Sequence, residues 1–318
     1  MKAEELKVKI KEDLLSVVLE NAKLMHPKEI LLMLRGEMKK EVIFSVVIAA
    51  ILLISYTASY KNVFEKRCKN PKREESFVIF PTEKTPAIIR DGDDLEIKYS
   101  GKIKEIYIDG KETNYSIREG EAHIKIEGFS KGFHTLRVKF QDRESVEDNA
   151  IYVTDINNSF CFAHITDMHI GGKIFDIKRD KILKTLKKIE NNKNVTFIIN
   201  TGDITDDGYE YEYAEYLSII QNITMPVYNV PGNHEIYQDN CLYTYNHYLG
   251  QLNYSFRVGN ILFIGLSSVE RGSAYGKFSE NELEWLDRTL KENNYSMAIL
   301  FFHHPVSVSY THLTLPTK

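Results

Sequence analysis

The stretch Cys161-Phe-Ala-His-Ile-Thr-Asp167-Met-His169-Ile-Gly-Gly172 decides the fold of the C-terminal half of this chain. It reads as a short apolar strand that runs into a loop carrying an aspartate and a histidine two residues apart. In an α/β fold, side chains that follow a strand in this way lie at the carboxyl edge of the sheet, where sites are built. The stretch therefore predicts an α/β fold with a polar site after this strand.

Three further segments repeat this arrangement. Asn200-Thr-Gly-Asp203 follows the apolar run 195–199, Val230-Pro-Gly-Asn233-His234-Glu235 follows 226–228, and His303-His304-Pro305 follows 297–302. This mixture of carboxylate, imidazole and amide groups suits Mn, Fe or Zn better than Mg or Ca. Two such ions that share a carboxylate can ionise a water and hold both oxygens of a phosphoryl transfer. We therefore expect two divalent metal ions as cofactors and a phosphate ester as substrate.

The four segments resemble the motifs of the calcineurin-like metallophosphoesterase family over residues 159–306. The resemblance implies an α/β metallophosphoesterase sandwich with a dinuclear metal site. It implies that Asp167 and His169 bind one metal and that Asp203 bridges both. Asn233 and His303 would bind the second metal.

The resemblance also implies the catalytic roles. His234 contacts the phosphate or protonates the leaving group, so His234 and Asp203 are the expected catalytic residues. We expect Asp206 and His304 to support the ligands as hydrogen-bond partners. The family's last motif, Gly-His-x-His, is absent from the sequence. Because that motif supplies an imidazole to each metal, we expect this chain to be weakly active or inactive.

The last residues, 307–318, resemble the translation of a sequencing adapter. We therefore set them apart from the fold and interpret the phosphoesterase domain as truncated after residue 306. Residues 1–37 form a predicted helical segment, in which 7–36 resemble the start of a JAMM/MPN-type isopeptidase domain. That family's later metal ligands do not follow, so we expect no isopeptidase activity. The alternatives for 1–37 are amphipathic helices or an artefact.

Residues 38–60 form a predicted transmembrane or signal-anchor helix. After Met38-Lys-Lys, the run 42–60 carries no charged side chain and is about as long as a helix must be to cross a bilayer. Basic residues flank it on both sides, so their distribution does not settle its orientation. We expect a membrane-anchored protein with an extracytoplasmic catalytic domain. The alternatives are a cytoplasmic catalytic domain and a buried core helix.

Residues 61–75 form a basic linker, and the pattern then changes over 76–155. Apolar and polar residues alternate there with period two, as in Leu95/Ile97/Tyr99 and Leu136/Val138/Phe140. Glycine turns such as Asp109-Gly110 and Glu119-Gly120 separate these runs. The pattern predicts an all-β sandwich domain of six or seven strands, and the run beginning at Gly132 resembles Ig-like modules.

Three helices are predicted among the later strands, at 176–189, at 209–220 and after Ser279. Ser279 and Glu282 have the spacing of a capping box.

Composition narrows the function further. The net charge is −4 and the pI is about 6.2, which argues against general nucleic-acid binding. The three cysteines, Cys68, Cys161 and Cys241, are scattered and form no CxxC pair, and Cys161 is expected in the core. The alternative function is a non-catalytic, membrane-anchored binding protein that uses its β-sandwich and keeps the phosphoesterase fold as a scaffold. The sequence leaves the oligomeric state open.

Overall fold

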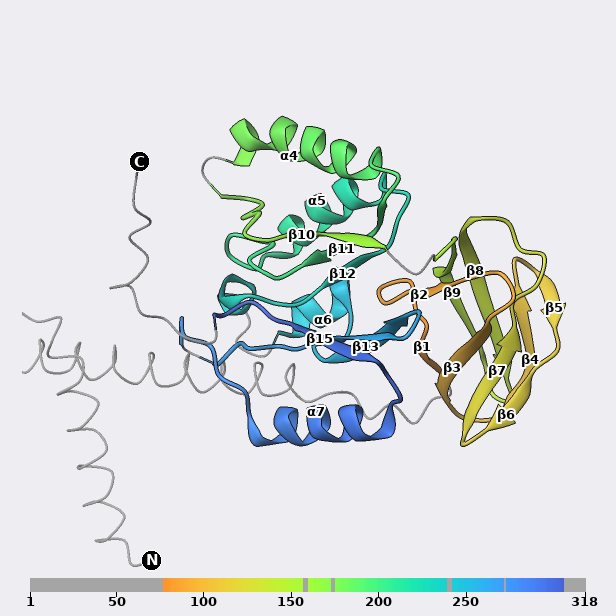
Figure 1. Ribbon diagram of the computed structural model, residues 1–318. Helices are drawn as coiled ribbons and strands as arrows, with labels where there is room; N and C mark the ends of the chain where they lie inside the picture. The colour runs from red at the N-terminus through yellow and green to blue at the C-terminus, as the bar shows by residue number, and fades with distance from the viewer. Residues whose placement is uncertain (1–76, 157–159, 173–174, 239–241, 272, 306–318) are drawn as a thin grey trace, which may run out of the picture. The chain divides into compact units, whose positions relative to one another are not determined.

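The computed structural model describes residues 77–156, 160–172, 175–238, 242–271 and 273–305 (Figure 1). The predicted segments 1–37, 38–60, 61–75 and 307–318 lie outside these residues. Within the part of the chain that is described, no helix combines the length and apolar character needed to span a membrane. The span expected over 42–60 therefore stays a prediction.

The N-terminal described region is an all-β domain of two sheets. One sheet has the order β1 (Phe77–Phe80), β3 (Asp94–Ser100), β7 (Glu121–Lys125), β6 (Ser116–Arg118). The other has the order β2 (Ala87–Ile89), β9 (Glu144–Val153), β8 (Gly132–Phe140), β4 (Ile103–Ile108), β5 (Lys111–Thr113). Buried side chains from both sheets, including Ile97 and Val138, form a single core cluster. The predicted sandwich is therefore confirmed, whereas its likeness to Ig-like modules stays a prediction.

The prediction of six or seven strands was too low, because nine strands are described in this domain. β2, β5 and β6 are three residues long and too short to show an alternating pattern. The predicted turns do occur. Asp109 and Gly110 both have positive φ, as do Glu119 and Gly120, which is the backbone that a two-residue hairpin requires.

The C-terminal region is built on two three-stranded sheets. β10 (Cys161–Ile165), β11 (Val195–Asn200) and β12 (Val227–Asn229) are parallel. In the other sheet, β14 (Ile261–Gly265) pairs antiparallel with β13 (Tyr254–Val258) and parallel with β15 (Met297–Phe301). A largely aromatic core joins the two sheets, and in it Tyr228 stacks on Phe256 with ring centroids 3.6 Å apart.

Helices cover the outer faces of these sheets (Figure 1). Leu186 of α4 (Phe175–Glu190) and Tyr213 of α5 (Glu210–Ile220) share a core cluster with Ile198 of β11. On the other sheet, Trp285 of α7 (Glu280–Glu292) packs against the cluster formed by β14. The three predicted helices are thus present, and the Ser279 hydroxyl caps α7 by accepting a hydrogen bond from the Glu282 N–H. A short helix, α6 (Tyr243–Leu249), was not predicted.

Cys161 was expected in the core, and this prediction was wrong, because the residue is exposed. Among the described strands β10 pairs only with β11, so it lies at the edge of its sheet, and Cys161 is its first residue.

The β-sandwich and the C-terminal region share part of their core. Ile88 of β2 is 6% exposed and belongs to the aromatic cluster that contains Phe197 and Tyr228. The Tyr228 hydroxyl donates a 2.7 Å hydrogen bond to the Pro86 carbonyl, and the Gln251 side chain donates to the Ile79 carbonyl at 3.1 Å. The two regions are therefore expected to support each other's stability.

Candidate metal centre

The polar residues of the four motifs follow the ends of four strands. Asp167 and His169 follow β10, Asp203 follows β11, Asn233 and His234 follow β12, and His303 follows β15. Since β10, β11 and β12 are parallel and adjacent, their loops emerge at the same edge of one sheet. His303 reaches this place from the second sheet, so the site lies where both sheets end.

The loop backbones are held in unusual conformations. Asp167, His169 and Asp203 have φ values of 56°, 47° and 49°, a left-handed region that costs a residue with a side chain about 1–3 kcal/mol. Main-chain hydrogen bonds hold the first loop against the second, with the His169 N–H donating to the Asp203 carbonyl at 3.0 Å. A Cβ atom on Gly232 would lie 2.1 Å from Asp203 Oδ1. The third loop can thus approach Asp203 only because residue 232 is a glycine.

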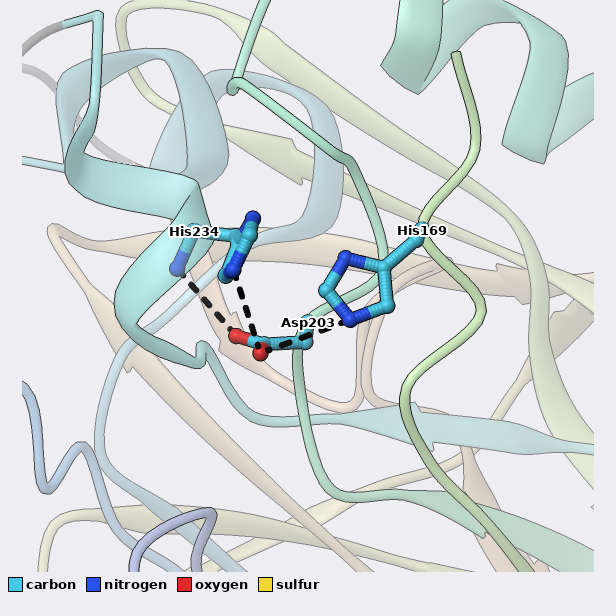
Figure 2. A group of neighbouring side chains, drawn as sticks. All are labelled: His169, Asp203 and His234. Atoms are coloured by element: carbon cyan, nitrogen blue, oxygen red, sulfur yellow. Dashed lines mark hydrogen bonds and ion pairs between the residues drawn. The ribbon is translucent and has the colours of Figure 1, made fainter. Parts of the chain in front are cut away.

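Three imidazoles surround the Asp203 carboxylate, whose side chain is only 7% exposed. Figure 2 shows two of them, His169 and His234. His303 Nε2 lies 3.4 Å from Asp203 Oδ1. The Nε2 atoms of His169 and His234 each lie 3.8 Å from Oδ2. His169 Nε2 also lies 3.9 Å from Asp167 Oδ1. The structure therefore brings together five of the six residues expected to contact metal or phosphate.

The other ring nitrogen of each histidine faces a protein oxygen. His234 Nδ1 lies 2.5 Å from the Asp206 carbonyl oxygen, and His303 Nδ1 lies 2.8 Å from the Thr201 carbonyl oxygen. A carbonyl can only accept, so Nδ1 carries a proton in both rings, and Nε2 is the nitrogen that faces Asp203. His169 Nδ1 lies 3.2 Å from Asp206 Oδ1, close enough for an ion pair but outside hydrogen-bond geometry.

This arrangement fits divalent metal ions. Histidine ligands usually donate their second ring nitrogen to a carboxylate or carbonyl, as His234 and His303 do. Two ligand atoms about 2.1 Å from one ion at a tetrahedral angle lie about 3.4 Å apart, close to the distances around Asp203. In two overlapping groups, His169–Asp203–His234 and Asp167–Asp203–His303, all the potential ligand atoms lie within 4.8 Å of one another. Both groups contain Asp203, as expected for a carboxylate that bridges two metals. They place Asp167 and His169 in different groups, whereas the family's pattern assigns both residues to one metal.

Asn233 lies beside this cluster at the start of the 3₁₀ helix η2 (Asn233–Ile236). Its Nδ2 donates to the Tyr237 hydroxyl at 3.3 Å. The backbone N–H of the next residue, His234, donates to Asp203 Oδ1 at 3.1 Å, which ties the start of η2 to the shared carboxylate.

His304 lies outside both groups. Its Nδ1 is 2.8 Å from the Ser268 hydroxyl, and burial lowers the pKa of this imidazole. Its ring meets that of His303 edge to face at 5.0 Å, so it packs against a candidate ligand. Asp206, by contrast, contacts two of the candidate histidines, His234 through its carbonyl and His169 through its carboxylate.

Sequence reasoning gave no role to Glu235, which joins two loops from a fully buried position. Its Oε2 accepts from the N–H groups of Asp203 at 3.0 Å and Gly232 at 2.6 Å. Its Oε1 accepts from the N–H and the hydroxyl of Thr205, both at 2.9 Å. Burial raises the pKa of Glu235 to about 7 despite these four donors. The sequence shows only that an acidic residue follows His234 directly. It does not show that this residue is buried, which is what gives Glu235 its role.

Comparison with known proteins identifies the C-terminal region. Residues 161–316 match the model of the calcineurin-like phosphoesterase family. This part of the chain belongs to the calcineurin-like phosphoesterase family. The match to this phosphoesterase model begins near the predicted boundary at 159 and ends beyond 306, within the segment set apart as 307–318.

Three curated relatives share this region. A probable glycerophosphodiester phosphodiesterase, GpdQ, of Arcobacter nitrofigilis is 32% identical over 163 residues, or 47% of this chain and 59% of the relative. A 3′,5′-cyclic-nucleotide phosphodiesterase of a Nostoc species is 30% identical, over 45% of this chain and 56% of the relative. A probable cyclic nucleotide phosphodiesterase of Xenorhabdus bovienii is 26% identical, over 46% and 63%. The chain thus spans less than two thirds of each of these relatives.

Proposed function

We propose that this chain hydrolyses phosphodiester bonds with the help of two divalent metal ions. The observation that carries the proposal is the shared Asp203 carboxylate, faced by three imidazoles whose Nδ1 atoms are turned away toward protein oxygens. The diester specificity is supported by the relatives, whose names describe phosphodiesterases.

The ligands would divide between the ions as the family's pattern implies. Asp167 and His169 would hold one ion, Asn233 and His303 the other, and Asp203 both. Bound in this way, divalent ions supply Lewis-acid charge and lower the pKa of a water at neutral pH. Comparing the affinities of the chain for Mn²⁺, Fe²⁺ and Zn²⁺ would show which of these ions it prefers.

His234 would act on the substrate directly. The Asp206 carbonyl fixes its proton on Nδ1, so Nε2 is the atom that gains and loses a proton. In its protonated form Nε2 can donate to the leaving oxygen as a general acid. Tight hydrogen bonding at Nδ1 also limits rotation of the ring, so the proton is delivered in a fixed direction.

Metal binding by the 318-residue chain tests this proposal. We expect Mn²⁺ or Zn²⁺ to bind at two sites, and Asp203→Asn to abolish binding together with hydrolysis of bis(p-nitrophenyl) phosphate. Asp207→Asn is the matched control, because Asp207 is exposed in the same loop. Because the sequence has no Gly-His-x-His motif, turnover is expected to be slow, and binding is the primary measurement. A wild-type chain that binds no divalent ion would overturn the proposal and favour the non-catalytic binding protein.

The membrane anchor is a separate proposal that rests on the sequence of residues 42–60 alone. We propose that this segment anchors the chain and leaves the phosphoesterase domain extracytoplasmic. Cell fractionation followed by protease treatment of intact cells tests it. Recovery in the soluble fraction would refute the anchor, and protection from the protease would favour the cytoplasmic orientation.

A further inference from the structure

The residue that follows η2 has a hydroxyl aimed at a candidate metal ligand. Tyr237 is the C-cap of this 3₁₀ helix, and its backbone N–H donates to the His234 carbonyl at 3.2 Å. The turn brings the tyrosine back over Asn233, whose Nδ2 donates to the Tyr237 hydroxyl at 3.3 Å. The tyrosine ring lies against the His234 ring, with centroids 4.6 Å apart.

We propose that Tyr237 is a positioning residue whose hydroxyl holds the Asn233 amide so that its Oδ1 faces the metal. The proposal rests on the proposed metal-dependent function. It adds a role for a residue that contributes no ligand atom itself.

The chemistry of the amide gives the reason. An asparagine can bind a hard cation only through Oδ1, because Nδ2 carries two hydrogens and no available lone pair. With Oδ1 turned to the ion, Nδ2 lies on the opposite side and needs an acceptor. The Tyr237 hydroxyl is at that side, 3.3 Å from Nδ2. A bound ion selects the orientation of the amide, and the hydroxyl then stabilises that orientation.

Because Tyr237 lies at the surface, its hydroxyl can be removed without destabilising the fold. Its side chain is 51% exposed, so the hydroxyl is reachable by water and its loss leaves no buried unpaired group on the tyrosine. The ring contact with His234 is retained by phenylalanine. Tyr237→Phe is therefore expected to remove the hydrogen bond that orients the Asn233 amide and to leave the rest of the structure unchanged.

The expected effect is a loss of metal affinity without a loss of stability. By calorimetric titration of the full chain with Mn²⁺, we expect Tyr237→Phe to bind about threefold to tenfold more weakly, with the same number of sites. Thermal unfolding in EDTA should be unchanged. Tyr243→Phe, an exposed tyrosine on α6, is the matched control and should bind as the wild type does.

A double-mutant cycle identifies the partner of the hydroxyl. In an Asn233→Ala background, which has no amide to position, Tyr237→Phe should weaken binding no further. If the two substitutions weaken binding independently, the hydroxyl acts elsewhere and the proposal fails. It also fails if Tyr237→Phe binds like the wild type, or if it lowers the unfolding temperature in EDTA. A wild-type chain that binds no Mn²⁺ would instead refute the proposed function.

Discussion

Glu235→Gln tests whether one buried carboxylate holds the metal-site loops together. Glutamine keeps the shape of the side chain but has a single acceptor oxygen where glutamate has two. In the wild type each carboxylate oxygen takes two hydrogen bonds, one pair from Asp203 and Gly232 and the other from Thr205. The substitution therefore removes acceptors without opening a cavity.

The magnitude follows from the orientation that glutamine can best adopt. If its oxygen accepts from Asp203 and Gly232, its Nε2 must face Thr205. The Thr205 hydroxyl can turn and accept from Nε2, but the Thr205 N–H is left facing another donor. A buried donor without an acceptor costs about 1–3 kcal/mol, so we expect the free energy of unfolding to fall by that amount at pH 8, where Glu235 is a charged carboxylate.

The loss of stability caused by Glu235→Gln should depend on pH. Burial raises the pKa of Glu235 in the folded chain to about 7, above its usual value of about 4.5. The folded state therefore binds this proton more tightly than the unfolded state does, and the resulting stability is complete below about pH 4.5 and lost as the pH rises to about 7. Glutamine does not titrate. The difference in stability between wild type and Glu235→Gln should thus be larger at pH 5 than at pH 8.

Urea unfolding in EDTA at both pH values measures this difference. EDTA is needed because a cation beside Asp203 would favour the charged carboxylate and lower the pKa again. Glu284→Gln, an exposed residue on α7, is the control and should change stability by less than about 0.5 kcal/mol. The reasoning fails if Glu235→Gln matches the wild type within that margin at pH 5, or if its effect is the same at both pH values.

Two further substitutions test the shared core and the loop contact. Ile88→Ala should lower the free energy of unfolding, measured in urea, by about 2–5 kcal/mol, because Ile88 is buried in the aromatic core of the phosphoesterase domain. Ile117, which is 57% exposed, provides the control. If Ile88→Ala is no more destabilising than Ile117→Ala, the two regions do not share a core. Gly232→Ala should weaken Mn²⁺ binding at least about tenfold, because the added methyl would lie 2.1 Å from Asp203 Oδ1. Gly120→Ala, where a methyl meets nothing within 4 Å, should bind normally, and equal binding by both variants would show that the loops move apart freely.

Several features could be predicted from the sequence because they depend on local patterns. The apolar runs before Asp167, Asp203 and His303 all proved to be strands, because a short apolar run bounded by turn residues favours a strand. The glycine turns of the sandwich were readable because a positive φ strongly favours glycine. The motif spacing also identified the phosphoesterase family before any contact was known.

Predictions failed where the outcome depended on neighbours distant in the sequence. Cys161 sits in an apolar strand, yet it is exposed because no described strand pairs with the outer edge of β10. The short strands β2, β5 and β6 form by pairing with longer strands and carry too few residues to show a period.

The candidate metal ligands, and the strands that they follow, could be read from the order of residues along the chain. Which of their atoms face one another depends on how the chain folds. The orientation of His303 depends on the Thr201 carbonyl, 102 residues earlier, and the Asp203 loop is held by a carboxylate 32 residues later. Such contacts leave no periodic trace, because a hydrogen bond between distant segments depends on how the sheets align and not on the residues next to either partner.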